Sequence, residues 1–228
     1  MNKSLIFTLT VFFLIAGLTA PGTLLAGELY DKVVGNDIAS VKKLLSEGAD
    51  INELTEVGGA GTVTPLFIAC SYYDDMAKLL IAKGADVNIK TSKGGVTPLM
   101  AACSSGKEEI ARLLISKGAD VNAKSNDGTG VFTYCVSGIL GGRVSTGLAE
   151  FLLSKGANVD ETSDTGPIAG YTCLMMAAGN KKPDLVKFLV KHGANVNARA
   201  KDGSTPLSMA AKDKDPEMVK LLKSLGAK

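Results

Sequence analysis

The residues best suited to covalent or metal chemistry are four cysteines and a single histidine. A cysteine nucleophile needs a neighbouring base, and His192 is the only imidazole in the chain. His192 stands between Lys191 and Gly193, a tripeptide typical of the end of a helix. No two cysteines have the C-x-x-C spacing of a redox or metal motif. These residues therefore predict no catalytic site and no metal site.

Two other patterns resemble ligand sites but are explained by local structure. Asp-x-Asn pairs such as Asp50 and Asn52 recur along the chain, as expected of residues that form turns. The glycine-rich stretch 138–143 lacks the Gly-Lys-Ser/Thr ending of a phosphate-binding loop. The formal net charge of +2 gives no basic surface for nucleic acid. We expect no cofactor, no nucleic-acid partner and no enzymatic activity.

The elements that carry these residues repeat. A Gly-Ala-Asp/Asn-Ile/Val-Asn/Asp cassette begins at Gly48, Gly84, Gly118, Gly156 and Gly193, with a stub at Gly226. A Thr-Pro/Cys-Leu cassette alternates with it at Thr64, Thr97, Thr172 and Thr205, and a degenerate copy starts at Gly130. The spacings between these starts are 33, 33, 42 and 33 residues. Internal periods of this size are typical of stacked supersecondary units.

Each period predicts two helices and a turn. Thr followed by Pro is a good helix start, because the hydroxyl caps free amides and Pro lacks the unpaired N–H. A second amphipathic helix precedes each Gly, as in 109–117 with Ile110, Leu113 and Leu114 at helical spacing. The Gly suits a helix end with positive φ, and the Asp/Asn stretch turns the chain back.

This register bears on the cysteines. Cys70 and Cys103 occupy equivalent positions in successive first helices, Cys135 lies one position earlier, and Cys173 replaces the Pro of its cassette. Packed helices lie about 8–10 Å apart, whereas a disulfide needs Cα atoms within about 7 Å. We predict four buried free thiols.

The two cassettes together resemble the ankyrin repeat, a unit of about 33 residues, over residues 28–228. The resemblance implies an all-α solenoid of about six helix-turn-helix units with β-turn fingers, which binds proteins on a concave face. The family's usual His after Thr-Pro-Leu is absent, and its place is taken by Phe67, Met100, Thr133, Met175 and Ser208. The predicted boundaries are a cap at 28–63, repeats at 64–96, 97–129, 130–171 and 172–204, and a C-terminal cap repeat at 205–228.

Residues 1–26 are typical of an export signal. Lys3 precedes an apolar run from Leu5 to Leu18, which is shorter than the roughly 20 residues of a membrane-spanning helix. Small residues follow, and we expect cleavage after Ala26 and no stable membrane span in the mature chain; the alternative is an uncleaved anchor. The remaining 202 residues contain 24 basic and 23 acidic side chains, a net charge of +1. The expected location is periplasmic or secreted.

The resemblance assigns partner binding to the first helices and the loops. Tyrosines and methionines at these positions suit a contact surface. Ile139 and Leu140 fall in a five-residue insertion predicted as a loop, and a second insertion lies within 161–171. The candidate contact residues are Ile68, Tyr72, Tyr73, Ser104, Tyr134, Ile139, Leu140, Tyr171, Met176 and Met209.

The expected function is a non-catalytic, exported interaction module, monomeric when free, that binds another protein. One version inhibits a cell-wall hydrolase or toxin as self-protection, and another is a scaffold for a periplasmic enzyme. A different class remains open: a small-molecule binder at the long turns, with a cleft where Arg143, Glu161 and Asp164 converge.

Signal cleavage predicts a defined mature protein. Intact-mass measurement of the protein recovered from the cell envelope or medium should show a chain starting at Gly27. A Leu14→Asp substitution interrupts the apolar run and should leave the full-length precursor in the cytoplasm. Full-length mass in the envelope fraction would instead favour the uncleaved anchor.

Overall fold

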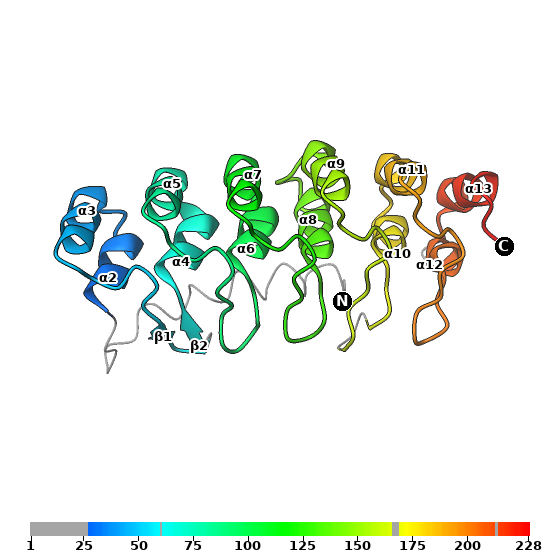
Figure 1. The fold of residues 1–228 in the computed structure, drawn as a ribbon. Coiled ribbons are helices and arrows are strands. Elements are labelled where there is room, and N and C mark those ends of the chain that lie inside the picture. The colour runs from blue at the N-terminus through cyan, green and yellow to red at the C-terminus, as the bar shows by residue number, and fades with distance from the viewer. Residues whose placement is uncertain (1–26, 60, 166–168, 213) are drawn as a thin grey trace. The chain divides into compact units, whose positions relative to one another are not determined.

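The computed structural model describes residues 27–59, 61–165, 169–212 and 214–228. The predicted signal at 1–26 lies outside them. In this described part of the chain helices dominate, and they form six successive antiparallel pairs joined by long turns, so the predicted all-α class is confirmed. Figure 1 shows these pairs and the long turns that connect successive pairs within each half. Among the described residues, no helix has the length and apolar character needed to cross a bilayer.

The chain divides into two compact halves, one ending at Asp120 and the other running from Val121 to Lys228. In the N-terminal half the first helices α2, α4 and α6 pack side by side, and α5 packs on α7. A short antiparallel hairpin, absent from the sequence expectation, fills the first long turn. The elements of this half are α2 (Glu28–Val34), α3 (Ile38–Ser46), β1 (Thr55–Val57), β2 (Gly61–Val63), α4 (Pro65–Tyr72), α5 (Asp74–Ala82), α6 (Pro98–Ser105) and α7 (Glu108–Ser116).

The C-terminal half repeats the arrangement. Its first helices α8, α10 and α12 lie in a row, and each packs on its own second helix. The elements of this half are α8 (Val131–Leu140), α9 (Thr146–Ser154), α10 (Cys173–Gly179), α11 (Pro183–Lys191), α12 (Pro206–Lys212) and α13 (Pro216–Ser224). In both halves the core consists of Leu, Ile, Val, Ala and Met side chains buried between helices, such as Leu80, Leu114 and Leu152.

The predicted helix starts and ends are confirmed. The hydroxyl of Thr64, Thr97 and Thr172 accepts a hydrogen bond from the backbone N–H three residues later, at 3.2, 3.2 and 3.3 Å. Each cassette Gly follows a second helix with φ between 88° and 98°. That left-handed conformation strains any residue with a Cβ, which explains why Gly recurs there.

The prediction of a loop at Ile139 and Leu140 is wrong. Helix α8 continues through Leu140 and is ten residues long, and the chain turns only at Gly141 and Gly142. The inserted residues therefore lengthen the helix before they form a loop. Helical continuation satisfies backbone groups that a loop would expose, and both side chains are half-buried.

The four cysteines are buried with free thiols, as predicted. Burial raises the pKa of the Cys70 thiol, and Asp74 adds to the effect. Burial likewise raises the pKa of Cys173, with a further contribution from Glu161. The Cys173 sulfur lies 3.7 Å from the Thr133 hydroxyl oxygen. The raised pKa keeps both thiols protonated. Because only a thiolate is a strong nucleophile, these two cysteines serve as packing groups.

The long turns are called fingers from here on, and at Asn52, Asn88, Asp160 and Asn197 the last residue of a Gly-Ala-Asp/Asn cassette joins one finger to the next cassette. The Asn88 side chain accepts from the N–H of Asp120 at 3.0 Å and donates to the Gly118 carbonyl at 3.1 Å. Asn197 makes the same two bonds to Lys228 and Gly226. These bonds add to the local turn bonds that the sequence predicts, such as Asn88 N–H to Asp86 at 2.8 Å.

Position 160 differs because it is an Asp. Both carboxylate oxygens of Asp160 accept from the N–H of Asn195, at 3.0 and 3.1 Å. A carboxylate cannot donate to the carbonyl of Gly193 as an amide would. This joint therefore lacks the second bond found at Asn88 and Asn197.

The difference predicts opposite effects on stability. Asn88→Asp should lower the free energy of unfolding by about 1 kcal/mol, because it removes the bond to Gly118. Asp160→Asn should raise it by about 0.5–1 kcal/mol by supplying the missing donor. Urea unfolding of both variants measures this, and equal shifts in the same direction would contradict the finger-joining role.

Candidate binding surface

A row of contact candidates lies on the C-terminal half. Tyr134, Met176 and Met209 are each the fourth residue of their helix, on α8, α10 and α12. All three side chains are half-buried, and they lie on neighbouring helices. The structure thus brings one Tyr and two Met side chains into one row, called the Tyr-Met row. Met is adaptable in shape, and Tyr buries a large area with little loss of rotamer freedom.

Tyr134 also reaches its finger. Burial raises the pKa of the Tyr134 phenol, a hydrogen bond with Ser125 opposes the rise, and the charge of Asp127 adds to it. Ser125 and Asp127 belong to the finger that precedes α8. The Tyr134 side chain therefore lies between α8 and the finger that precedes it.

The equivalent row in the N-terminal half is less available. Ile68 and Ala101 are only 9% and 3% exposed, and Ser104 is 6% exposed with its hydroxyl donating to the Ala101 carbonyl. Ile68 and Ser104 therefore offer a partner little surface. Because both residues are buried, the structure does not support their predicted role in partner contact.

The two tyrosines at the C-terminal end of α4 have different roles. Tyr73 donates its hydroxyl to the Val34 carbonyl at 2.9 Å, so it joins α4 to the preceding hairpin. Tyr72 is 38% exposed and its ring lies 6.0 Å from that of Tyr73. Tyr72 is the better contact candidate of the two.

Tyr171 joins two fingers. Its hydroxyl donates to the Asp202 carboxylate at 2.9 Å, and its ring is half-buried. The Asp202 carboxylate also accepts from the N–H of Ser204, and these bonds, led by those to Ser204, hold its pKa below the usual range. Tyr171 thus fixes the finger beside α12 while leaving part of its ring at the surface.

One exposed apolar residue is absent from the predicted contact residues. Leu54, in the finger between α3 and β1, is 59% exposed. The other copies of the cassette have polar residues at this position: Lys90, Lys124, Thr162 and Arg199. The contrast between one Leu and four polar residues is the signal that would have identified it.

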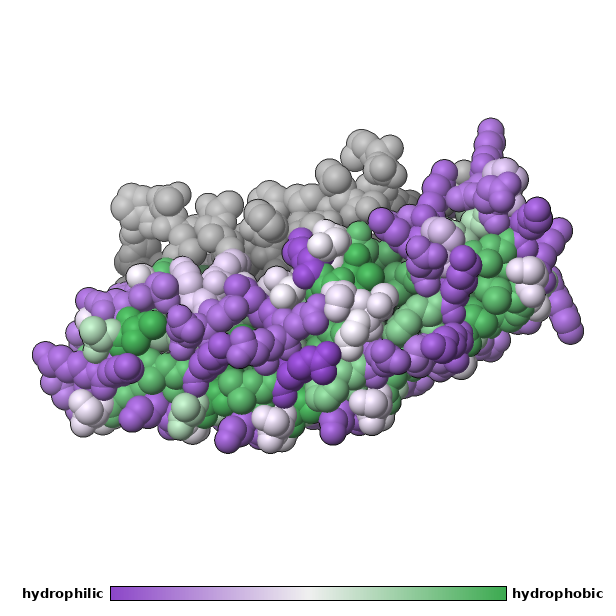
Figure 2. All heavy atoms as spheres, turned by 90° about the horizontal axis from the view of Figure 1, so that it is seen from above, coloured by the Kyte–Doolittle hydropathy of each residue, from purple (hydrophilic) through white to green (hydrophobic). Residues whose placement is uncertain are grey.

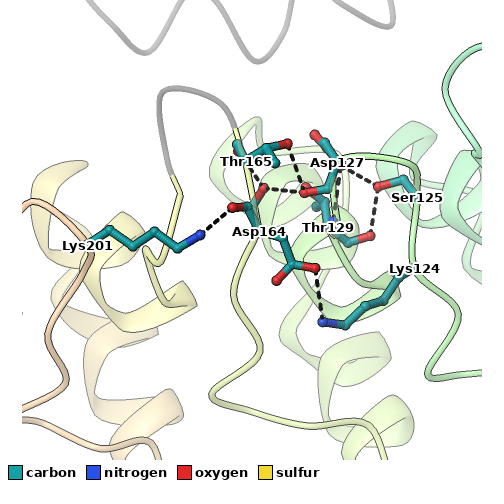
Figure 3. A network of polar contacts seen from close by, with 8 residues as sticks. Lys124, Ser125, Asp127, Thr129, Asp164, Thr165 and Lys201 are labelled. Atoms are coloured by element: carbon teal, nitrogen blue, oxygen red, sulfur yellow. Dashed lines mark hydrogen bonds and ion pairs between the residues drawn. The ribbon is translucent and has the colours of Figure 1, made fainter.

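The described residues of the second insertion take part in a polar network around Asp127 (Figure 3). The Asp127 carbonyl accepts from the N–H groups of Asp164 and Thr165 at 2.9 and 3.2 Å. The Asp164 carboxylate lies 3.9 Å from the Lys124 amine, and the Asp164 carbonyl accepts from the Lys201 amine. The network docks the insertion against the fingers on either side.

The predicted convergence of Arg143, Glu161 and Asp164 is not present. Glu161 is 7% exposed, and its carboxylate accepts from the N–H of Thr133, while Asp164 is turned toward Lys124. Arg143 lies in the turn after α8 with its guanidinium beside Gly141, at the opposite end of α8 from Glu161. The three side chains do not form a common polar site.

Glu161 instead completes the start of α8. Gly130 is the N-cap of α8 and has no side chain to accept from the third amide of the helix. The Glu161 carboxylate takes the place of the missing Thr, and a Cβ on Gly130 would overlap it. Helix α2 has the same arrangement, with Gly27 as N-cap and Glu53 accepting from Tyr30 N–H at 2.7 Å.

Comparison with known proteins identifies the repeat. The family model described as "Ankyrin repeats (3 copies)" matches residues 30–125 and 142–228. The chain belongs to the ankyrin repeat family. Its architecture is that of a protein–protein interaction module, because stacked repeats expose extended surfaces for partners.

Individual relatives share parts of these ankyrin repeats. The chain is 29% identical over 181 residues to the B-cell lymphoma 3 protein homolog of Mus musculus, covering 78% of this chain and 39% of that protein. It is 48% identical over 67 residues to protein phosphatase 1 regulatory subunit 27 of Homo sapiens, covering 29% and 41%. A putative ankyrin repeat protein of fowlpox virus is 31% identical over 135 residues, covering 59% and 28%. The chain spans less than half the length of each relative.

The single histidine lies at the end of a second helix of the ankyrin repeats. His192 follows α11, its Nδ1 lies 2.8 Å from the Phe188 carbonyl oxygen, and its Nε2 lies 3.8 Å from a Glu150 carboxylate oxygen. The predicted place at a helix end is confirmed. Glu150 and His192 line a shallow groove together with Leu153, Ser154, Ala157, Asn158 and Val159.

Removal of the Glu161 cap should destabilise the protein. Glu161→Ala leaves the buried Thr133 N–H without its acceptor and should lower the free energy of unfolding by about 2 kcal/mol. Gly130→Thr should be unfavourable in the wild type, where the new Cβ meets the carboxylate, but should restore most of the loss in the Glu161→Ala background. Gly130 already has a φ of −88°, close to the −87° of Thr97. Urea unfolding of the two single variants and the double variant measures the coupling.

The pH dependence provides a second check on this cap. Burial raises the pKa of the Glu161 carboxyl, despite the bonds to Thr133 and the charge of Lys124. A folded-state pKa above the unfolded value means that protonation favours the folded chain. The stability of the wild type relative to Glu161→Gln should therefore rise as pH falls through the raised pKa. An unchanged difference from pH 7 to pH 4 would contradict this assignment.

Proposed function

We propose that the protein is exported by residues 1–26 and binds another protein, without catalysis, in the periplasm or outside the cell. The observation that carries the binding proposal is the Tyr-Met row on α8, α10 and α12. Its three side chains stand at one register position of three neighbouring helices. The export proposal rests on the charged start and short apolar run of the N-terminal sequence.

The surroundings of the Tyr-Met row favour a protein partner. Tyr and Met side chains are enriched at interfaces, where they supply much of the buried area. The fingers beside the row are held by the Tyr171–Asp202 bond and by the network around Asp127. A pre-ordered surface binds with a smaller loss of conformational entropy.

Two roles are consistent with such a surface in an exported protein. One is inhibition of a cell-wall hydrolase or toxin by covering its active site, as self-protection. The other is a scaffold that holds a periplasmic enzyme. A cell that lacks the protein separates them, because loss of an inhibitor leaves the target overactive, while loss of a scaffold leaves its enzyme mislocalised.

The binding proposal is tested by crosslinking from defined positions. A photo-crosslinking residue at Tyr134 or Met209 should form a covalent adduct with one envelope or extracellular protein. The same residue at Lys187, which is exposed on α11, should not. Met176→Ser with Met209→Ser should weaken the isolated complex at least tenfold, because two apolar contacts are lost.

A matched control distinguishes loss of contact from loss of folding. Val190→Ser changes a half-buried residue of α11, outside the Tyr-Met row, and should leave affinity within twofold. Adducts from Lys187 alone, or equal weakening by both sets of variants, would place the partner elsewhere on the protein.

A further inference from the structure

The two halves of the mature chain differ in charge. Residues 27–120 contain 10 Lys and Arg against 13 Asp and Glu, a net charge of −3. Residues 121–228 contain 14 basic and 10 acidic residues, a net charge of +4. The half with the Tyr-Met row is therefore the basic one.

Four lysines of this half gather at the ends of two first helices. Lys181 and Lys182 follow α10, Lys212 ends α12 and Lys214 follows it, and all four are exposed. Lys181 and Lys214 have left-handed φ values of 55° and 51°. Helices α10 and α12 pack on each other. The four residues are called the lysine cluster.

The lysine cluster adjoins the Tyr-Met row. Lys212 follows Met209 by three residues on α12, a spacing that puts two side chains on one helix face. Met176 lies one turn before the end of α10, and its carbonyl accepts from the Asn180 side chain at 2.8 Å. Figure 2, seen from the side of the second helices, shows long hydrophilic side chains projecting at the end that carries α12 and α13.

Three acidic groups of the C-terminal half are committed to internal bonds. Asp215 accepts from the N–H of Met218 at 3.0 Å and caps α13. Asp202 is bonded to Tyr171 and Ser204, and Asp160 to Asn195. Each of these carboxylates has a structural role that holds it in place. The four residues of the lysine cluster, by contrast, stand at a helix end and in turns whose backbone geometry does not require Lys.

The N-terminal half uses the equivalent positions differently. Helix α6 is followed there by Gly106, with φ of 80°, and by Lys107. The Lys107 amine lies 2.7 Å from a carboxylate oxygen of Asp74, in the neighbouring hairpin. The Lys107 charge thus forms an ion pair between neighbouring hairpins in the N-terminal half. The lysine cluster lies only in the two described hairpins from α10 to α13.

We infer that the partner of the Tyr-Met row is a protein segment that carries acidic side chains beside apolar ones. This inference rests on the proposed function and names the chemistry of its partner. The apolar side chains contact Tyr134, Met176 and Met209, and the acidic ones lie against the lysine cluster. Charge complementarity of this kind sets orientation and speeds association. A nucleic acid would satisfy the lysines but leave the apolar row without a counterpart.

Selection from a random peptide library tests the inference directly on the purified protein. Peptides displayed on phage are selected for binding to the wild type. Of these, the peptides that do not bind the Met176→Ser, Met209→Ser variant are retained for sequencing. The retained peptides should have a negative net charge and at least two apolar residues. Fluorescence anisotropy with one synthetic peptide then gives the affinity and its salt dependence.

The lysine cluster is tested by a matched pair of variants. Replacing Lys181, Lys182, Lys212 and Lys214 by Gln should weaken the peptide about tenfold at low salt and flatten the salt dependence. The control replaces four exposed lysines near the ends of second helices by Gln: Lys83, Lys117, Lys155 and Lys191. The control removes the same charge and should change affinity less than twofold.

The outcomes separate the inference from the proposed function. Retained peptides that are neutral or basic, or equal weakening by both lysine variants, overturn the inference and leave protein binding by the Tyr-Met row intact. Peptides that bind the Met variant as well as the wild type, or no enrichment on the wild type, count against both. Tighter binding of a short DNA duplex than of any peptide, lost on the lysine-cluster variant, would replace the protein segment by a nucleic acid.

Discussion

The third amide of each first helix sets a constraint on the rest of the structure. Most of these helices begin among buried residues, where no solvent can accept from an unpaired N–H. A Thr hydroxyl meets the need at α4, α6, α10 and α12. At α2 and α8 a Glu carboxylate reaches in from a finger. The finger and the helix are fixed to each other at α8, which places the Tyr-Met row beside ordered turns.

The Thr cap and the Glu cap place different requirements on the sequence. A Thr cap is local, since donor and acceptor are three residues apart. A Glu cap joins residues 28 positions apart at α8 and 23 at α2, and it requires a Gly opposite, because any side chain would overlap the carboxylate. The degenerate start at Gly130 is thus one half of a two-part arrangement, and Glu161 is the other.

The sequence predicts what is local and periodic. The helix starts at Thr64, Thr97 and Thr172, the left-handed glycines and the buried cysteines follow from capping, φ preference and register. The joining of fingers by Asn88 and Asn197 could not be predicted, because it depends on how successive turns pack. The repeat period does not predict that α8 continues through Leu140, because it assigns those residues to an insertion. Burial separates the contact candidates Met176 and Met209 from Ile68 and Ser104, and a repeat period alone carries no information on that difference.

The direction of the finger bonds has a consequence for how such a chain can change in length. Asn88 and Asn197 contact backbone groups at positions one and three of the next cassette, and Asp160 contacts the backbone group at position three. Those backbone groups are the same whatever side chains the next repeat carries. Duplication or loss of a whole repeat therefore leaves a valid hydrogen-bonded joint at the seam. Repeats that hold their own Glu and Gly keep their helix cap through such an exchange, so the array can be recombined one unit at a time without loss of its internal order.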